Sequence, residues 1–111
     1  MKRGDIYVAD LAPVIGSEAD KRRPVLIVSN DANNRAASTV TIVPITSNTT
    51  KTHPFEVLLP AKETGLPKSS KAQAQQVRTI SKARLEVTVT GALSPPLMEE
   101  LEDALRLHLG L

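Results

Sequence analysis

The stretch Glu18-Ala19-Asp20-Lys21-Arg22-Arg23-Pro24-Val25-Leu26-Ile27-Val28-Ser29 joins a charged loop to a run of branched aliphatic residues. Such a run is typical of a buried strand. Pro24 suits the first position of that strand, because it has no N–H to donate to the ladder, and it biases Arg23 towards an extended backbone. The loop therefore delivers Arg23 to the rim of the sheet, where binding and catalytic groups collect. An ordinary solvated arginine is the plainer interpretation.

Composition narrows the class of protein. A chain of 111 residues has the size of one domain, and we expect a single domain over residues 1–111. It lacks cysteine, which excludes disulfides and thiolate chemistry. It has neither an apolar run of about 18 residues nor an N-terminal signal-peptide pattern. A cytoplasmic protein of bacterial type, without a membrane span, fits these features. One Tyr and one Phe predict an aliphatic core and few platforms for base stacking.

The charge is unevenly distributed along the chain. Residues 62–84 hold six basic side chains against one acidic one, whereas residues 86–111 hold five acidic side chains against one arginine. This pattern favours a face that binds polyanions, with the acidic segment turned away. A surface on which the charges mix in space is the alternative.

Apolar alternation predicts strands over residues 5–11, 39–46, 55–59 and 87–89, and the aliphatic run predicts one over residues 24–29. Alternation is harder to see over residues 70–80, where a strand is expected because Val77 and Ile80 end a polar-rich run without a helical stripe. We expect one helical turn within residues 30–35, another within 81–85, and a plain turn over 62–67. Pro44 implies an edge position or a bulge in its strand, and a bulge would re-aim Thr46 and Ser47.

The chain ends in a predicted helix. Ser94 suits its N-cap, and Pro95 and Pro96 suit its first turn. An apolar stripe follows at helical spacing, formed by Leu97, Met98, Leu101, Leu105, His108 and Leu109. The fold class is therefore mainly β with short helices: a small, strongly bent antiparallel sheet or open barrel with a C-terminal helix.

The residues that are missing limit the chemistry. The two histidines, His53 and His108, stand far apart and there is no cysteine, so neither a His/Cys metal site nor a Ser-His-Asp triad is expected. No glycine-rich phosphate loop is present, and we predict no cofactor and no metal. Four carboxylates are Mg²⁺ candidates in principle, but turn and strand-end roles suit them better: Asp5, Asp10, Glu18 and Asp20.

What remains is an arginine at a strand entry, a glutamate five residues before it, and hydroxyls at the exit of another strand. A guanidinium binds two non-bridging phosphate oxygens in its planar fork, and a hydroxyl donates a third hydrogen bond. This set suits stabilisation of a pentacoordinate phosphorane. RNA supplies its own nucleophile, the 2′-OH.

Several short motifs stand in family order, and together they make the chain resemble the MazF/PemK toxins of toxin–antitoxin systems. They are Arg3-Gly4-Asp5-Ile6, Gly16-Ser17-Glu18, Arg23-Pro24-Val25-Leu26-Ile27-Val28-Ser29-Asn30, Val43-Pro44-Ile45-Thr46-Ser47, Pro54-Phe55-Glu56-Val57 and Gln76-Val77-Arg78-Thr79-Ile80. The resemblance implies an SH3-like barrel of the CcdB/PemK type and a homodimer. It further implies sequence-specific endoribonuclease activity on single-stranded RNA, and inhibition by a cognate antitoxin.

By position, the family's catalytic Arg and Thr fall on Arg23 and Thr46, and the loop Glu of some members falls on Glu18. Glu18 is physically an easier general base than Arg23, because a guanidinium does not deprotonate near neutral pH. The family's RNA-contacting Gln matches Gln76, which strand alternation would place near Arg78. The full set of predicted RNA contacts is Ser17, Lys21, Arg22, Ser47, Asn48, Lys51, Gln76 and Arg78.

Two other functions stay open. A CcdB-like toxin that binds a topoisomerase would share the fold, but it needs no Arg–Thr pair. A non-catalytic nucleic-acid-binding module is suggested only by the basic segment. Some relatives also carry an aromatic residue in the loop before the catalytic arginine, which residues 12–22 lack. Base recognition here would therefore depend on hydrogen bonds and on Lys21 or Arg22.

Overall fold

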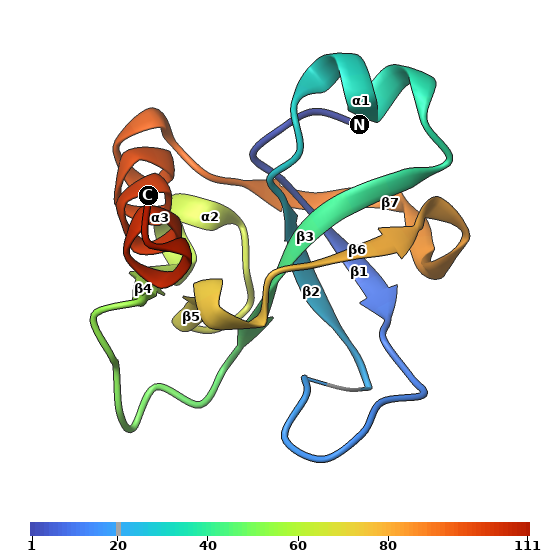
Figure 1. Cartoon of the computed structure of the whole chain (residues 1–111). Coiled ribbons are helices and arrows are strands. Elements are labelled where there is room, and N and C mark those ends of the chain that lie inside the picture. Colours follow the sequence, from blue (N-terminus) through green and yellow to red (C-terminus); the bar gives the residue numbers. More distant parts are fainter. Residues whose placement is uncertain (20) are drawn as a thin grey trace.

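The structure, a computed structural model, describes residues 1–19 and 21–111. Figure 1 shows a twisted antiparallel sheet with a helix along one side. The elements in chain order are the strands and helices β1 (Asp5–Asp10), β2 (Arg22–Ile27), α1 (Asp31–Ala36), β3 (Thr39–Thr46), β4 (Glu56–Leu59), α2 (Ala61–Thr64), β5 (Ser70–Gln73), the 3₁₀ turn η1 (Ala74–Gln76), β6 (Arg78–Ser81), the 3₁₀ turn η2 (Lys82–Arg84), β7 (Leu85–Ala92) and α3 (Pro95–Leu109).

The strands form one sheet in the order β4-β5-β3-β2-β1-β7, and β6 pairs with β3 as well. The end strands β4 and β7 do not pair with each other in the part of the chain that the structure describes, so the sheet stays open. This confirms the mainly β fold with a C-terminal helix. No described helix is long and apolar enough to cross a membrane.

Both faces of the central strands are buried. Leu26 packs in the core that lies under α3, whereas its neighbours Val25 and Ile27 pack in a second core on the opposite face. β1 and β3 alternate in the same way, with Ile6 in the first core and Tyr7 in the second. Successive side chains of a strand point to opposite faces. An uninterrupted aliphatic run is therefore what a strand between two cores requires.

The single strand expected over residues 70–80 is wrong, because η1 divides it into β5 and β6. β3 pairs with β6 through Thr39–Ile42 and with β5 through Ile45 and Thr46. Pro44 falls where β3 changes partner. It is fully buried and faces Val25 of β2, so the predicted edge position is also wrong. The sheet accommodates a residue without an N–H at a point where the ladder is already interrupted.

Three further boundaries differ from expectation. The strand expected over residues 24–29 is observed as β2 over Arg22–Ile27, so Pro24 is its third residue and not its first. The plain turn expected over residues 62–67 begins as the helix α2, which Gly65 ends in a left-handed conformation. The last strand is longer than residues 87–89, and Val87 and Val89 are exposed on it because β7 lies at an edge of the sheet. The helical turns expected near residues 30–35 and 81–85 are confirmed as α1 and η2.

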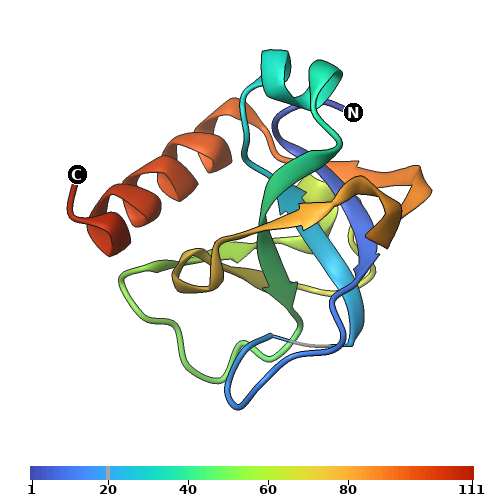
Figure 2. The same ribbon diagram turned by 45° about the vertical axis from the view of Figure 1, so that its right-hand side comes forward.

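Helix α3 begins as its sequence predicts. The Ser94 hydroxyl accepts a hydrogen bond from the Leu97 N–H at 3.4 Å, and Leu97, Leu101 and Ala104 are buried against the sheet. The expected apolar stripe holds only in the first part of the helix, because His108 and Leu109 are exposed. Figure 2 shows this last part of α3 projecting past the strands.

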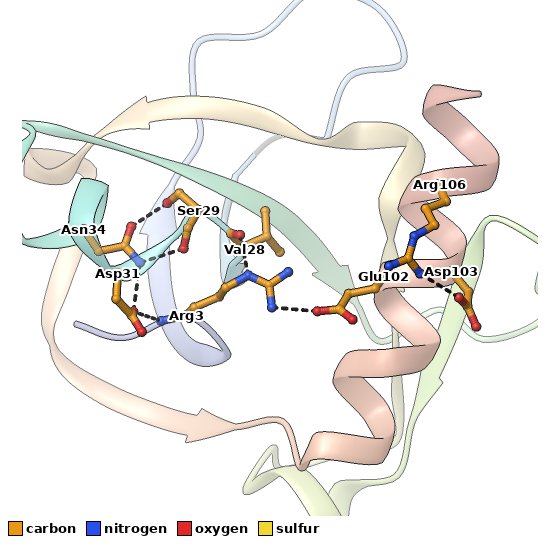
Figure 3. A network of polar contacts seen from close by, with 8 residues as sticks. All are labelled: Arg3, Val28, Ser29, Asp31, Asn34, Glu102, Asp103 and Arg106. Atoms are coloured by element: carbon orange, nitrogen blue, oxygen red, sulfur yellow. Dashed lines mark hydrogen bonds and ion pairs between the residues drawn. The ribbon is translucent and has the colours of Figure 1, made fainter. Parts of the chain in front are cut away.

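Arg3 ties α3 to the rest of the fold (Figure 3). Its Nη1 donates to Glu102 Oε2 at 2.8 Å and its Nε donates to the Val28 carbonyl at 2.9 Å. The Arg3 backbone N–H donates to Asp31 Oδ1 at 2.7 Å. One residue therefore links the N-terminus, α1 and α3, and part of the acidic charge of the C-terminal segment is used inside the molecule.

Candidate active site

A cavity of about 330 Å³ lies where β2 begins and β3 ends. This is within the size range of small-ligand sites. Val25 faces Pro44 in the antiparallel register, and Arg23 and Thr46 each lie two residues beyond this pair, towards the same end of the two strands. Both residues line the cavity. The complete lining is Arg22, Arg23, Pro24, Ile45, Thr46, Ser47, Leu66, Pro67, Lys68 and Ser70.

Thr46 has the geometry of a hydrogen-bond donor to a ligand. Its Oγ1 accepts the backbone N–H of Asn48 at 3.2 Å. Because the oxygen already accepts this bond, the hydroxyl proton is available to point into the cavity. Thr46 is half-buried, and Arg23 is half-buried beside it. A guanidinium and a hydroxyl at one cavity wall can together hold an anionic group.

Glu18 is placed differently. It is exposed and does not line the cavity. Its Oε1 accepts the Ile15 N–H at 2.8 Å, so the carboxylate caps a turn within its own loop. Asp20 lies outside the described residues. Within residues 1–19 and 21–111, no three His, Asp or Glu side chains gather as a metal-binding group.

The RNA contacts predicted around the loop between β1 and β2 divide into two groups. Arg22 lines the cavity and forms an ion pair with Glu86, while Lys21 is exposed with a left-handed φ of 67°. Ser17 meets Gln76 instead: the Ser17 carbonyl accepts from Gln76 Nε2 at 3.1 Å. Gln76 Oε1 in turn accepts the Ala19 N–H at 3.1 Å. The Gln76 amide therefore holds this loop in place.

The second loop follows Thr46, and Ser47 lines the cavity. Asn48 and Lys51 are exposed beyond it. Arg78 is not among the residues that line the cavity, and its Nη1 donates to the Leu11 carbonyl at 3.5 Å. The expected strand alternation between Gln76 and Arg78 is wrong, because Gln76 belongs to η1 and not to β6.

A second part of the cavity lining was not found from the sequence. It consists of Leu66, Pro67, Lys68 and Ser70, which lie between α2 and the start of β5. Lys68 brings a cation to the cavity together with Arg22 and Arg23. The sequence offered one signal for Lys68, its place in the basic segment of residues 62–84. Spacing did not distinguish it from the other five basic residues of that segment.

Four of the six basic residues in that segment donate to backbone carbonyls elsewhere in the chain: Lys71, Arg78, Lys82 and Arg84. These contacts lie on different elements. These four side chains are therefore tied to different parts of the chain, and a polyanion-binding face formed by residues 62–84 stays a prediction. The cations that line the cavity come mainly from β2.

The chain is similar to known proteins over nearly its whole length. Residues 2–109 match the family model described as "PemK-like, MazF-like toxin of type II toxin-antitoxin system". The chain is 46% identical to endoribonuclease MazF9 of Mycobacterium tuberculosis over 100% of this chain and 98% of that protein. It is 40% identical to endoribonuclease EndoA of Bacillus subtilis, over 100% and 96%.

Solved structures agree with the sequence matches. MazF from Deinococcus radiodurans superposes with a TM-score of 0.86 at 27% identity, over 100% of this chain and 97% of that chain. A mycobacterial endoribonuclease solved in complex with its cognate antitoxin superposes with a TM-score of 0.82 at 30% identity, over 100% and 96%. The chain described here belongs to the PemK-like, MazF-like toxin family of type II toxin–antitoxin systems.

Proposed function

We propose that this protein is an endoribonuclease toxin that cleaves single-stranded RNA at specific sequences by metal-independent transesterification. The observation that carries the proposal is the presence of Arg23 and Thr46 in the lining of one cavity, in a chain of the MazF-like family. The two relatives named above are endoribonucleases and match the whole chain.

The proposed reaction is an in-line displacement at phosphorus. The RNA 2′-oxygen attacks the adjacent phosphorus and loses its proton to a base, while the bond from phosphorus to the 5′-oxygen breaks. The leaving 5′-oxygen takes up a proton. The products are a 2′,3′-cyclic phosphate and a 5′-OH, and the atoms balance without water or metal.

Arg23 and Thr46 act on the charge that develops on phosphorus. The guanidinium binds two non-bridging oxygens, and the Thr46 hydroxyl donates a third hydrogen bond. Donors that point at the charge developing in the transition state lower the barrier to the reaction. Arg22 and Lys68 add positive charge around the same cavity. We propose Ser47 as a further donor there, and Ser17, Lys21, Asn48, Lys51, Gln76 and Arg78 as outer contacts for the RNA strand.

Glu18 is proposed as the base that accepts the 2′-OH proton. In this structure its carboxylate accepts a hydrogen bond from the Ile15 N–H. Its role as a base therefore requires the turn at residues 15–18 to open towards the RNA.

The proposal includes partners. An acidic, partly disordered antitoxin segment would compete with RNA for the cationic cavity and block cleavage. The exposed edge strand β7 supports assembly as a homodimer, since open strand edges invite pairing. We further propose a cytoplasmic location, where RNA and antitoxin are both available.

The test is cleavage of a single-stranded RNA in excess EDTA, with analysis of the product ends. Arg23→Ala should lower the rate by about 10²–10³, the usual effect of losing one transition-state donor. Thr46→Val keeps the β-branched shape and removes only the hydroxyl. Arg106→Ala on α3 and Thr39→Val at the other end of β3 are matched controls outside the cavity lining.

A substrate with one 2′-deoxy nucleotide on the 5′ side of the scissile phosphate should bind and resist cleavage. Cleavage of that substrate would make water the nucleophile and overturn the mechanism. RNA binding without any cleavage would favour a non-catalytic module. Absence of both RNA binding and RNA cleavage would favour a CcdB-like toxin that binds a topoisomerase.

A further inference from the structure

The loop between β3 and β4, residues 47–55, borders the site. Figure 1 shows it as a long excursion that returns to β4. Residues 47–54 are exposed, and Phe55 is half-buried and stacked on His53 at 5.1 Å between ring centroids. Ser47 lines the proposed catalytic cavity, and Thr49 lines a second cavity of about 190 Å³. The loop therefore contributes one residue to the lining of each cavity.

A buried ion pair lies beneath this loop. Lys71 of β5 faces Thr46 directly in the β3–β5 register, and its Nζ donates to Glu56 Oε1 at 3.0 Å. The side chains are 10% and 2% exposed. Neither residue lines either of the two cavities named above. Moving two charges out of water costs free energy, and further hydrogen bonds to the pair offset that cost.

The pair binds the loop backbone. Lys71 Nζ donates to the Lys51 carbonyl at 2.5 Å, and Glu56 Oε1 accepts the His53 N–H at 3.0 Å. The second carboxylate oxygen of Glu56 accepts Gln75 Nε2 at 2.9 Å. Burial pushes the pKa of Glu56 upward, but the bonds from Gln75, His53 and Lys71 outweigh it and leave the pKa below its ordinary value. The carboxylate is thus held in its charged form.

The network also reaches the other loop of the site. Gln75 belongs to η1, and the next residue, Gln76, holds the backbone of Ser17 and Ala19. The turn that divides β5 from β6 therefore stands between the two loops that flank the cavity. Its two glutamines bind one loop each, Gln76 directly and Gln75 through Glu56.

We propose that Lys71 and Glu56 are positioning residues that hold residues 47–55 in the conformation that catalysis requires. The proposal rests on the ribonuclease function above. Lys71 acts through the Lys51 carbonyl and Glu56 through the His53 N–H, and neither touches RNA. Without them the loop would sample other conformations. The groups that follow Thr46 would then leave their positions, including the Asn48 N–H that orients the Thr46 hydroxyl.

The experiment compares Lys71→Met with a matched control, Lys82→Met. Lys82 also donates its ammonium to a backbone carbonyl, that of Asn34 at 2.6 Å, but it lies outside both cavities. Because Lys71→Met leaves a buried carboxylate without its partner and is liable to unfold, the double variant Lys71→Met, Glu56→Gln is made beside it. It removes both charges together.

The first readout is hydrogen exchange of the intact protein without RNA. Loss of a charge-assisted bond should speed exchange at residues 50–54 by about tenfold or more, with α3 unchanged. The second readout is steady-state cleavage. A mispositioned loop should lower kcat by about 10- to 100-fold, while Lys82→Met leaves both readouts at the wild-type level.

Unchanged exchange in the 50–54 segment of the folded variants would overturn the proposal. Faster exchange with wild-type kcat would also overturn it, because the loop would then be held without consequence for catalysis. A wild-type protein that does not cleave RNA would instead refute the ribonuclease function. The exchange experiment would still decide whether Lys71 and Glu56 hold the loop.

Discussion

Gly91 is the position where one added methyl group should cost most. It lies in β7 opposite Ile6 of β1, and the backbone of α2 approaches it closely. A Cβ at Gly91 would stand 1.9 Å from the Thr64 carbonyl oxygen and 3.1 Å from the Thr64 carbonyl carbon. Ordinary contacts between carbon and oxygen begin at about 3.3 Å. Gly91→Ala therefore requires β7 or α2 to move by more than an ångström.

The expected cost follows from this collision. Overpacking costs about 1–3 kcal/mol, and the upper end applies because both colliding groups are backbone. Alanine stabilises through the unfolded chain by only about 0.4–1 kcal/mol. The net loss should be about 2 kcal/mol, which lowers the midpoint of thermal unfolding by roughly 8 °C in a chain of this size. Urea unfolding and thermal unfolding followed by circular dichroism measure it.

The same variant bears on the site, because α2 leads directly into the wall formed by Leu66, Pro67 and Lys68. We expect Gly91→Ala to weaken RNA cleavage even below its unfolding temperature. Gly16→Ala is the control: nothing lies within 4 Å of its added Cβ, so it carries only the conformational cost of a φ of 61°. A Gly91→Ala protein as stable as the wild type would refute this account of the packing between α2 and β7.

Two further predictions concern carboxylates. The Arg3 N–H lowers the pKa of Asp31, and the pKa of Glu56 is also below its ordinary value; groups of this kind stabilise the fold above their unfolded pKa and lose that contribution as the pH falls through the folded value. Unfolding free energy should therefore decrease between about pH 5 and pH 3, and Asp31→Asn or Glu56→Gln should flatten that decrease in urea titrations, whereas parallel curves would contradict the assignment. Glu18→Gln should remove the acidic limb of the pH–rate profile if the carboxylate is the base; an unchanged profile would leave Glu18 as the cap of its own turn.

Much of the architecture follows from local patterns in the sequence. The alternation over residues 39–46 and the Ser94-Pro95-Pro96 start of α3 each act over a few residues, and both are found where they were expected. The aliphatic run after Pro24 also forms a strand, but β2 begins and ends two residues earlier than expected. Side-chain periodicity and capping depend on neighbours in the chain, so they can be recognised without the fold. Arg23 and Thr46 also stood out in this way, each at the end of a strand.

The tertiary structure decided which groups meet. Leu66 and Lys68 line the same cavity as Arg23 although more than 40 residues separate them from it. Lys71 belongs to the basic segment of residues 62–84, but its side chain is buried against Glu56 and the Lys51 carbonyl. The division of residues 70–80 by η1, and the burial of Pro44 within the sheet, depend on where β3 changes partner. Hydrogen bonds between distant residues follow from strand register, and register emerges only when all the strands pack together.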